Sequence, residues 1–304
     1  MFVVGILAKI MIKAVLSRIV FFFLFLISLL PFWFLYLASD VSYIVLFYIV
    51  GYRREVVQQN LRNSFPNKSP QDLKVIEKQF FRYLCDLIFE TIKMITISKK
   101  QVLRRIRLTN PELIEDYYQQ GRSLIAAVGH YCNWELCILR FSLLPQYQKV
   151  MVYKPLQDAA SDKYYLKVRG RFGVTLVQMK ATLRKLTELR KSLTFTVLAA
   201  DQTPVQHETQ YFTLFLNQQT AVFQGIEKIA IMFNSAIVFG EIKRIKRGFY
   251  QYKFVPLVNE PKQTQPFEIT NLYLRHLEQM INNEPQYWLW SHRRWKFKPE
   301  DVNK

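Results

Sequence analysis

A long stretch without charge near the N-terminus constrains the fold of this chain more than any other feature. Residues 19–39 contain no charged side chain and consist mostly of Phe, Leu, Ile and Trp. The hydrocarbon core of a bilayer is about 30 Å thick, and a helix of roughly 20 apolar residues crosses it. We therefore expect this segment to span a membrane or to embed deeply in one, with Pro31 kinking the helix. The alternative is a pair of buried helices in a soluble protein.

A second apolar run covers residues 41–52 and leads into a pair of arginines, Arg53 and Arg54. Such a run can lie in the membrane interface and carry the chain along the surface. Basic residues also precede the first run, so loop charge alone does not set the orientation. We predict an N-terminal membrane anchor with an interfacial helix over residues 1–54 and one main domain over residues 55–304, because no repeat or linker divides the rest.

The charge balance and the cysteine content limit the classes of protein that remain. The chain has 42 Lys and Arg against 23 Asp and Glu, a net charge of +19, which favours an anionic partner such as a membrane leaflet, a nucleic acid or an acidic carrier. Three cysteines are few, and their number is odd, which argues against a secreted domain stabilised by disulfide bonds. With 9 glycines and no G-x-G-x-x-G or Walker pattern, we expect no nucleotide cofactor, and no motif predicts a metal site.

Short apolar runs alternate with amphipathic stretches through the main domain, after a long amphipathic helix predicted to begin at Ser69 and to end near Ile97. This alternation is typical of an α/β fold with a central, mostly parallel sheet flanked by helices. The last two strands should form an antiparallel hairpin with a basic turn. We expect strands at 123–128, 150–153, 174–177, 195–199, 236–242 and 249–255, and helices at 111–121, 134–144, 160–171, 181–190 and 266–283.

Two polar groups follow predicted strands, where open α/β sheets carry their chemistry. His130 comes just after the strand at 123–128, and Asp201 and Gln202 come just after the strand at 195–199. An imidazole has an unperturbed pKa of about 6.5, which suits a general base near neutral pH. A histidine that only caps a helix or bonds a carbonyl is the structural alternative, and position alone does not choose between the two.

The acid that would orient His130 is also open at this stage. Glu135 lies five positions further on, and residues five apart on a helix point about 140° apart. Glu135 can therefore reach His130 only if His130 precedes the helix, and otherwise Asp201 is the better partner. We keep both acids as catalytic candidates. Cys132 is a less favoured nucleophile, because a small buried cysteine is the commoner case.

Several motifs then match a known family in order along the chain. Residues 129–135 (G-H-Y-C-N-W-E) resemble the H-x4-D/E motif of the glycerolipid-type acyltransferases, and the closest similarity is to the lipid A late acyltransferases, the lauroyl and myristoyl transferases of Kdo-lipid IVA. The C-terminal block is the most specific of the matches. The other matching blocks are 60–66 (N-L-R-N-S-F-P), 153–156 (Y-K-P-L), 170–173 (G-R-F-G), 201–202 (D-Q) and 285–296 (P-Q-Y-W-L-W-S-H-R-R-W-K).

The resemblance implies a membrane-bound acyltransferase on the cytoplasmic face of the inner membrane. It would move a fatty acyl group from acyl carrier protein to a hydroxyl of a lipid A precursor, without a covalent acyl-enzyme. His130 would act as general base in direct attack on the thioester, with Glu135 or Asp201 behind it. The alternatives are an acyltransferase for another membrane lipid, such as a lysophospholipid, aminolipid or glycolipid, and a non-catalytic lipid- or nucleic-acid-binding protein. No nucleic-acid motif is present, so we expect no nucleic-acid partner.

Four residues are predicted to contact substrate: Asn133, Arg169, Arg171 and Gln202. The arginine forks match phosphate oxygens, and Arg171 or backbone N–H groups near Asn133 would serve as oxyanion donors. The stretch at 221–226 and the loop at 203–211 depart from the family pattern, which should reshape the substrate pocket. The basic turn at 243–247 is expected to be exposed surface charge. The C-terminal Trp-rich block is expected to clamp the core rather than to lie in the membrane interface.

Overall fold

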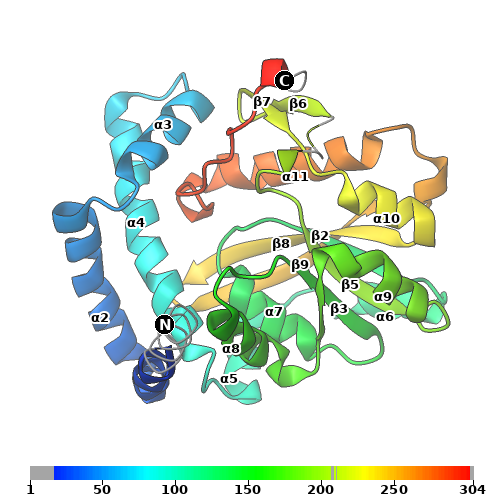
Figure 1. Cartoon of the computed structure of the whole chain (residues 1–304), viewed down its shortest axis with the longest axis horizontal. Helices are drawn as coiled ribbons and strands as arrows, with labels where there is room; N and C mark the ends of the chain where they lie inside the picture. The colour runs from blue at the N-terminus through cyan, green and yellow to red at the C-terminus, as the bar shows by residue number, and fades with distance from the viewer. Residues whose placement is uncertain (1–16, 207–208, 210, 302–304) are drawn as a thin grey trace, which may run out of the picture.

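The computed structural model describes residues 17–206, 209 and 211–301. It confirms the predicted α/β class, because one seven-stranded sheet lies between helices (Figure 1). The strand order is β1-β9-β8-β2-β5-β3-β4, and the predicted β8–β9 hairpin supplies the antiparallel pair. The strands are β1 (Ile106–Leu108), β2 (Leu124–Val128), β3 (Gln148–Tyr153), β4 (Thr175–Gln178), β5 (Thr194–Ala199), β8 (Ala236–Lys246) and β9 (Phe249–Val258).

Helices cover both faces of this sheet, which explains why β2 is a continuous apolar run and why β5 is buried along nearly all of its length. α10 and α11 pack on one face, and α5 and α7 pack on the other (Figure 1). A small hairpin of β6 (Phe212–Phe215) and β7 (Gln218–Ala221), which was not predicted, lies beside α11. The helices of this part are α5 (Lys99–Arg105), α6 (Pro111–Gln119), α7 (Trp134–Ser142), α8 (Ala159–Arg169), α9 (Thr182–Glu188), α10 (Gly225–Phe233) and α11 (Glu268–Asn283).

The N-terminal apolar region forms two helical pieces that meet at Pro31, as expected. The helix Ser17–Leu29 ends before the proline, and α2 (Phe32–Ile44) then continues as a π-helix, η1 (Val45–Val50). The second apolar run is thus a direct continuation of α2, with no break at Asp40, whereas we expected a separate interfacial segment. By length and composition, Phe32–Val50 can cross a membrane.

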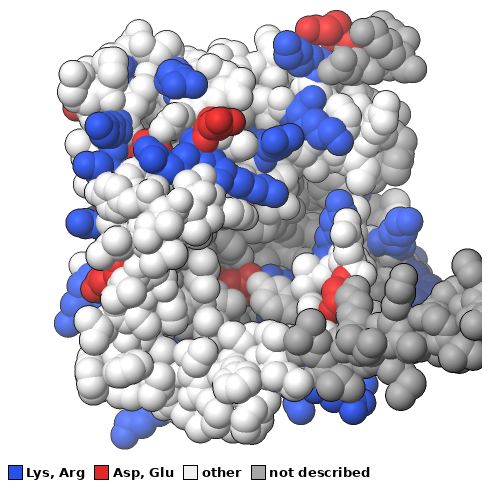
Figure 2. Space-filling model, turned by 60° about the vertical axis from the view of Figure 1, so that its left-hand side comes forward, with Lys and Arg blue, Asp and Glu red and all other residues white. Residues whose placement is uncertain are grey.

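This apolar rod, Phe32–Val50, is not the core of a soluble protein. One side of the rod packs on the protein through Phe32, Leu35, Tyr43 and Phe47, which are buried. The other large apolar side chains are mostly exposed: Trp33 is 68% exposed and Ile49 is 75% exposed. Figure 2 shows the molecule from the side on which α2 lies. This face has a stretch of uncharged surface bordered by Lys and Arg side chains, and it is hollowed near its centre. The exposed apolar surface argues against the buried-helix alternative and is weak support for a membrane anchor.

One long helix joins the rod to the sheet domain. After α3 (Arg54–Ser64), the chain enters α4 (Pro70–Lys93), whose start is fixed by the Ser69 hydroxyl accepting from the Asp72 N–H at 3.1 Å. α4 packs along α2 on one side, at the left of Figure 1, and approaches α7 on the other. Because α4 touches both, it links the apolar rod to the helix that follows His130.

Candidate functional site

His130 and Asp201 meet at one edge of the sheet. β2 and β5 are parallel neighbours with Val128 opposite Ala199, and each polar residue lies two positions beyond its strand end. Because the carboxyl ends of parallel strands share an edge, this register brings the two side chains together. The strand ends that carry the two residues were predicted, whereas the pairing of β2 with β5 comes from the structure.

The Asp201 carboxylate takes part in three hydrogen bonds, two of which hold His130. His130 Nδ1 lies 2.6 Å from Oδ1, and the His130 backbone N–H donates to Oδ2 at 2.8 Å. Trp288 Nε1 donates to the same Oδ2 at 3.0 Å and so fixes the carboxylate from behind. Asp201 is buried, whereas the His130 side chain keeps 22% of its surface exposed. Nε2 is therefore the ring nitrogen left for a substrate.

This geometry changes the acidity of both groups. Burial by itself would raise the pKa of Asp201, but the imidazole and the other donors lower it to about 2. Burial by itself would lower the pKa of His130, but the Asp201 carboxylate outweighs it and raises that pKa above its ordinary value. The pair thus stabilises an imidazolium, which a general base becomes once it has taken a proton.

Glu135 belongs to a second cluster instead of bonding His130. Arg169 donates from Nε to Oε2 at 2.9 Å and from Nη2 to Oε1 at 2.5 Å, and the Tyr165 hydroxyl and Trp134 Nε1 donate to Oε1. Burial would raise the pKa of Glu135, but the Arg169 guanidinium lowers it below its ordinary value. His130 does precede α7, yet Glu135 turns toward α8, so the acid that contacts the imidazole is Asp201.

The two clusters are adjacent. The Trp134 ring lies edge-on to the His130 ring, 5.1 Å between centroids, and its indole N–H bonds Glu135. Phe21, from the helix Ser17–Leu29, stacks on Tyr164 at 4.1 Å, next to Tyr165. The Glu135–Arg169 cluster therefore adjoins the imidazole through Trp134, and α8, which supplies Arg169, contacts the apolar N-terminal helix.

The remaining predicted contacts occupy different environments. Asn133 is buried, and its Oδ1 accepts from the Leu136 N–H at 2.8 Å to cap α7. Arg171 is exposed and donates to the Met94 carbonyl, and Gln202 is exposed. Arg171 and Gln202 are therefore available to a ligand, whereas Arg169 is bound to Glu135. Burial raises the pKa of the Cys132 thiol well above its ordinary value, which keeps it protonated and argues against a nucleophile.

The turn that carries His130 has a constrained backbone. A Cβ on Gly129 would lie 2.6 Å from Leu277 Cδ1, so a larger residue here would require the Leu277 side chain to move. Cys132 has a φ of 49°, in the left-handed region, and its N–H donates to the Tyr287 carbonyl at 3.0 Å. Non-glycine residues rarely adopt this conformation, and those that do are concentrated at functional turns, where neighbouring residues impose it.

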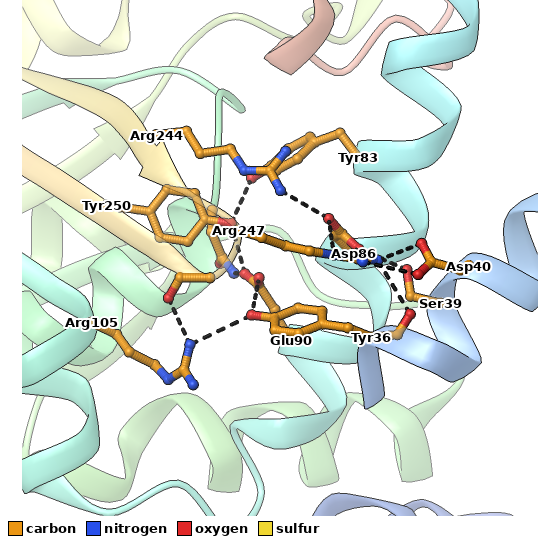
Figure 3. Close-up of polar contacts among 12 residues, drawn as sticks. Tyr36, Ser39, Asp40, Tyr83, Asp86, Glu90, Arg105, Arg244, Arg247 and Tyr250 are labelled. Atoms are coloured by element: carbon orange, nitrogen blue, oxygen red, sulfur yellow. Dashed lines mark hydrogen bonds and ion pairs between the residues drawn. The ribbon is translucent and has the colours of Figure 1, made fainter. Parts of the chain in front are cut away.

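A buried carboxylate, Glu90, links Asn133 to the apolar rod. Figure 3 shows its contact with Tyr36 of the rod. Glu90 of α4 accepts from Asn133 Nδ2 at 2.5 Å, from the Tyr36 hydroxyl of α2 at 2.9 Å and from the Tyr250 hydroxyl at 2.8 Å. Burial raises the pKa of Glu90 above its ordinary value. Sequence reasoning missed this residue, because its partners are at least 43 positions away.

The C-terminal block clamps the core, as expected, but it also enters the site. Trp290 and Arg294 are almost fully buried, and Trp288 bonds Asp201. His292 Nε2 accepts from the Thr203 N–H at 3.1 Å, which holds the chain just after Asp201, and burial together with Arg294 lowers the pKa of His292 to about 4. The missed role of Trp288 had a signal, since it belongs to the most specific motif. Tyr165 also had one, since it precedes Arg169 by four positions on one helix face.

An imidazole that is 22% exposed and backed by a buried carboxylate has the arrangement that general-base chemistry requires. In the part of the chain that the structure describes, no three metal-binding side chains come together. The sequence pattern of a family described as "Bacterial lipid A biosynthesis acyltransferase" matches residues 9–297. The chain belongs to this family and is an acyltransferase.

Two curated relatives agree with this membership. A lipid A biosynthesis lauroyltransferase of Escherichia coli (strain K12) is 24% identical over 255 residues, which cover 82% of this chain and 81% of the relative. A lipid A biosynthesis acyltransferase of Haemophilus influenzae (strain ATCC 51907 / DSM 11121 / KW20 / Rd) is 22% identical over 245 residues, 78% of this chain and 74% of the relative. The similarity therefore extends over most of both proteins.

Proposed function

We propose that this protein transfers a fatty acyl group from acyl carrier protein to a hydroxyl of a lipid A precursor, with His130 as general base. The bond between His130 Nδ1 and Asp201 at 2.6 Å carries the proposal, because it commits one ring nitrogen to the carboxylate and leaves Nε2 for the acceptor. Family membership supports the acyl-transfer chemistry. The lipid A precursor is the acceptor that the names of the relatives suggest.

In the proposed reaction, Nε2 takes the proton of the acceptor hydroxyl while its oxygen attacks the thioester carbonyl. The resulting imidazolium faces the ionised Asp201, which stabilises it. Collapse of the tetrahedral intermediate breaks the C–S bond, and the thiolate leaving group receives the proton from His130. The N–H groups of Trp134 and Glu135, in the first turn of α7, are the candidate oxyanion donors, since a helix N-terminus favours negative charge.

The other residues have supporting roles in this proposal. The exposed Arg171 and Gln202 contact the acceptor headgroup, and Arg171 suits a phosphate because its fork matches two oxygens. The Glu135–Arg169 ion pair forms one side of the site, next to His130. An acyl carrier protein donor places the catalytic face in the cytoplasm, with the apolar N-terminal helices holding the domain on the inner membrane. Neither a metal nor a cofactor takes part in the proposed steps.

In vitro transfer tests this function. The purified full chain is incubated with a lipid A precursor and a panel of acyl-carrier-protein thioesters, and acylated product is measured by mass spectrometry. We expect acyl transfer by the wild type and its loss in His130→Ala. Full transfer by His130→Ala would contradict the base assignment and would favour a non-catalytic lipid-binding role.

An acyltransferase for another membrane lipid is the second candidate, because residues 221–226 are bulkier than the family pattern. These residues lie at the end of β7 and lead into α10. Deleting the gene and comparing the lipids of the host separates the two acceptors. Unchanged lipid A acylation, with loss of an acyl chain from a lysophospholipid, aminolipid or glycolipid, would identify the second.

A further inference from the structure

A charged cavity lies between the apolar rod and the β8–β9 hairpin, and neither His130 nor Asp201 lines it. Its volume is about 540 Å³. Asp40 and Tyr48 reach it from the rod, Arg82 and Asp86 from α4, and Arg244 and Arg247 from the hairpin. Ligand pockets commonly enclose about 300–1,000 Å³, so the space suits a small polar group.

The basic turn at 243–247 was expected to be plain surface charge, and the structure corrects this for two of its residues. Arg247 makes two bonds to Asp40, at 2.7 and 3.0 Å, and also contacts Asp86 at 2.6 Å (Figure 3). Arg244 contacts Asp86 at 3.0 Å, and its side chain is only 17% exposed. Asp86 is therefore surrounded by donors and has no capacity left to neutralise a third cation.

The positive charge in the cavity exceeds the negative charge. Three guanidinium groups face two carboxylates, and among the described residues Arg82 forms no ion pair. Arg244 Nε is buried and has no hydrogen-bond acceptor among the residues that the structure describes. The protein thus leaves donors and one formal positive charge unmatched here, and an anion would supply both the acceptors and the charge.

The exposed side chains of the rod indicate how deep in a membrane this cavity would lie. Trp33, Leu37 and Ile49 expose their side chains on the rod, whereas Asp40 near its middle is 59% exposed and paired with Arg247. A carboxylate and its arginine partners are costly at the centre of a bilayer but not at its surface. The rod therefore fits an in-plane position at the depth of the lipid headgroups, as an interfacial helix does.

We propose that this cavity binds the phosphate headgroup of an anionic membrane lipid. Its main contact is Arg82, whose guanidinium lies 5.1 Å from the centre of the Tyr43 ring and forms no ion pair among the described residues. The site is separate from the His130–Asp201 pair. A phosphate bound there would dock the domain at a set depth and orientation on the bilayer. The proposal rests on the membrane attachment included in the proposed function, but it does not depend on which lipid is acylated.

Native mass spectrometry of the full chain in a mild non-ionic detergent tests the proposal. The protein is titrated with phosphatidic acid, with phosphatidylcholine and with inorganic phosphate, and the retained molecules are counted. We expect one phosphatidic acid per chain in the wild type, and binding at least about tenfold weaker in Arg82→Gln, since a charge-assisted bond to phosphate is lost. Arg82→Glu should abolish retention. Both variants should fold, which circular dichroism checks, because Arg82 is exposed.

The matched control is Arg184→Gln, because Arg184 is an arginine on α9 whose side chain is 82% exposed and does not line the cavity. Equal weakening by Arg184→Gln and Arg82→Gln would mean nonspecific attraction and would overturn the proposal. Unchanged binding by Arg82→Gln, or equal retention of phosphatidylcholine, would also overturn it. Inorganic phosphate bound as tightly as phosphatidic acid would overturn the assignment to a lipid. His130→Ala should keep the bound lipid while acyl transfer is lost, which separates this site from the proposed function.

Discussion

At the scale of single residues, two buried carboxylates near His130 differ in what they hold. Asp201 bonds the imidazole, and Glu135 bonds a guanidinium, although Glu135 is only five positions from His130. The difference arises because Glu135, in the first turn of α7, points toward α8, whereas Asp201 follows β5 at the edge of the sheet where His130 lies. The two acids should therefore respond differently to neutral replacement.

Asp201→Asn should lower kcat by about 10³–10⁴-fold, as expected when a general base loses the carboxylate that sets its tautomer. The base must be neutral to act, so kcat/KM should rise with pH through the pKa of His130, which Asp201 raises. In the variant, the rising limb of the pH–rate profile should move to lower pH. A pH–rate profile of acyl transfer measures both effects.

The control for this prediction is the double variant His130→Ala with Asp201→Asn, which should be no slower than His130→Ala alone, because residues that act as a unit are not additive. A kcat for Asp201→Asn within tenfold of wild type, with the limb unmoved, would contradict the role assigned to Asp201.

Glu135→Gln should act mainly through Arg169, whose side chain is 12% exposed and would lose its partner. Removing one member of a buried ion pair destabilises a protein by about 3–5 kcal/mol. The double variant Glu135→Gln with Arg169→Met should recover about 1–3 kcal/mol relative to the sum of the two single changes. Denaturant unfolding of the four proteins gives this coupling, and strict additivity would mean that the pair is not coupled. The pH–rate limb should move less than in Asp201→Asn.

At the scale of elements, the turn between β2 and α7 is held from three directions. Asn133 caps α7, Glu90 of α4 holds Asn133, and Tyr287 accepts from Cys132. Most helices and strands were predictable here because their signals are local, such as apolar periodicity and the start of the long helix at Ser69. The hairpin β6–β7 and the helices α3, α5 and α10 were not predicted, and neither was the short edge strand β1.

Asn133→Ala should cost about 0.5–2 kcal/mol through the lost cap and should lower kcat further, up to about 100-fold, because the turn that positions His130 loses its support. Ser69→Ala is the matched control. It removes a cap of the same kind from α4, at a distance from the turn, and should cost similar stability with kcat unchanged. Thermal unfolding and transfer rates measured together test this, and equal kcat for both variants would contradict a positioning role for Asn133.

At the scale of the whole molecule, the structure joins an exposed apolar rod to a basic α/β domain. The excess of Lys and Arg and the outward-facing apolar side chains both favour contact with an anionic membrane surface. Ion pairs between Asp40, Arg247 and Asp86 fasten the rod to α4 and to the hairpin. The rod and the domain should therefore meet the membrane as one unit.

Leu37→Glu should weaken membrane attachment without unfolding the domain, because Leu37 is 56% exposed and lies on the outer side of the rod. Burying a Leu side chain contributes about 1.5–3 kcal/mol, so partitioning into vesicles should fall at least about tenfold. Flotation with lipid vesicles measures the effect. Leu183→Glu, at a site 47% exposed on α9, is the control that should leave partitioning unchanged. Equal partitioning of wild type and Leu37→Glu would contradict attachment through this face.

The sequence by itself determined the α/β class, the break at Pro31 and the strand ends that carry His130 and Asp201. These features depend on interactions within a few residues along the chain, which spacing and residue type report. Only the tertiary structure decided that Asp201 rather than Glu135 contacts the imidazole, that Glu90 supports Asn133, and that Arg244 and Arg247 turn inward to Asp86. Those partners lie 43 to 161 positions apart, and packing of separate elements, not local pattern, brings them within hydrogen-bond distance.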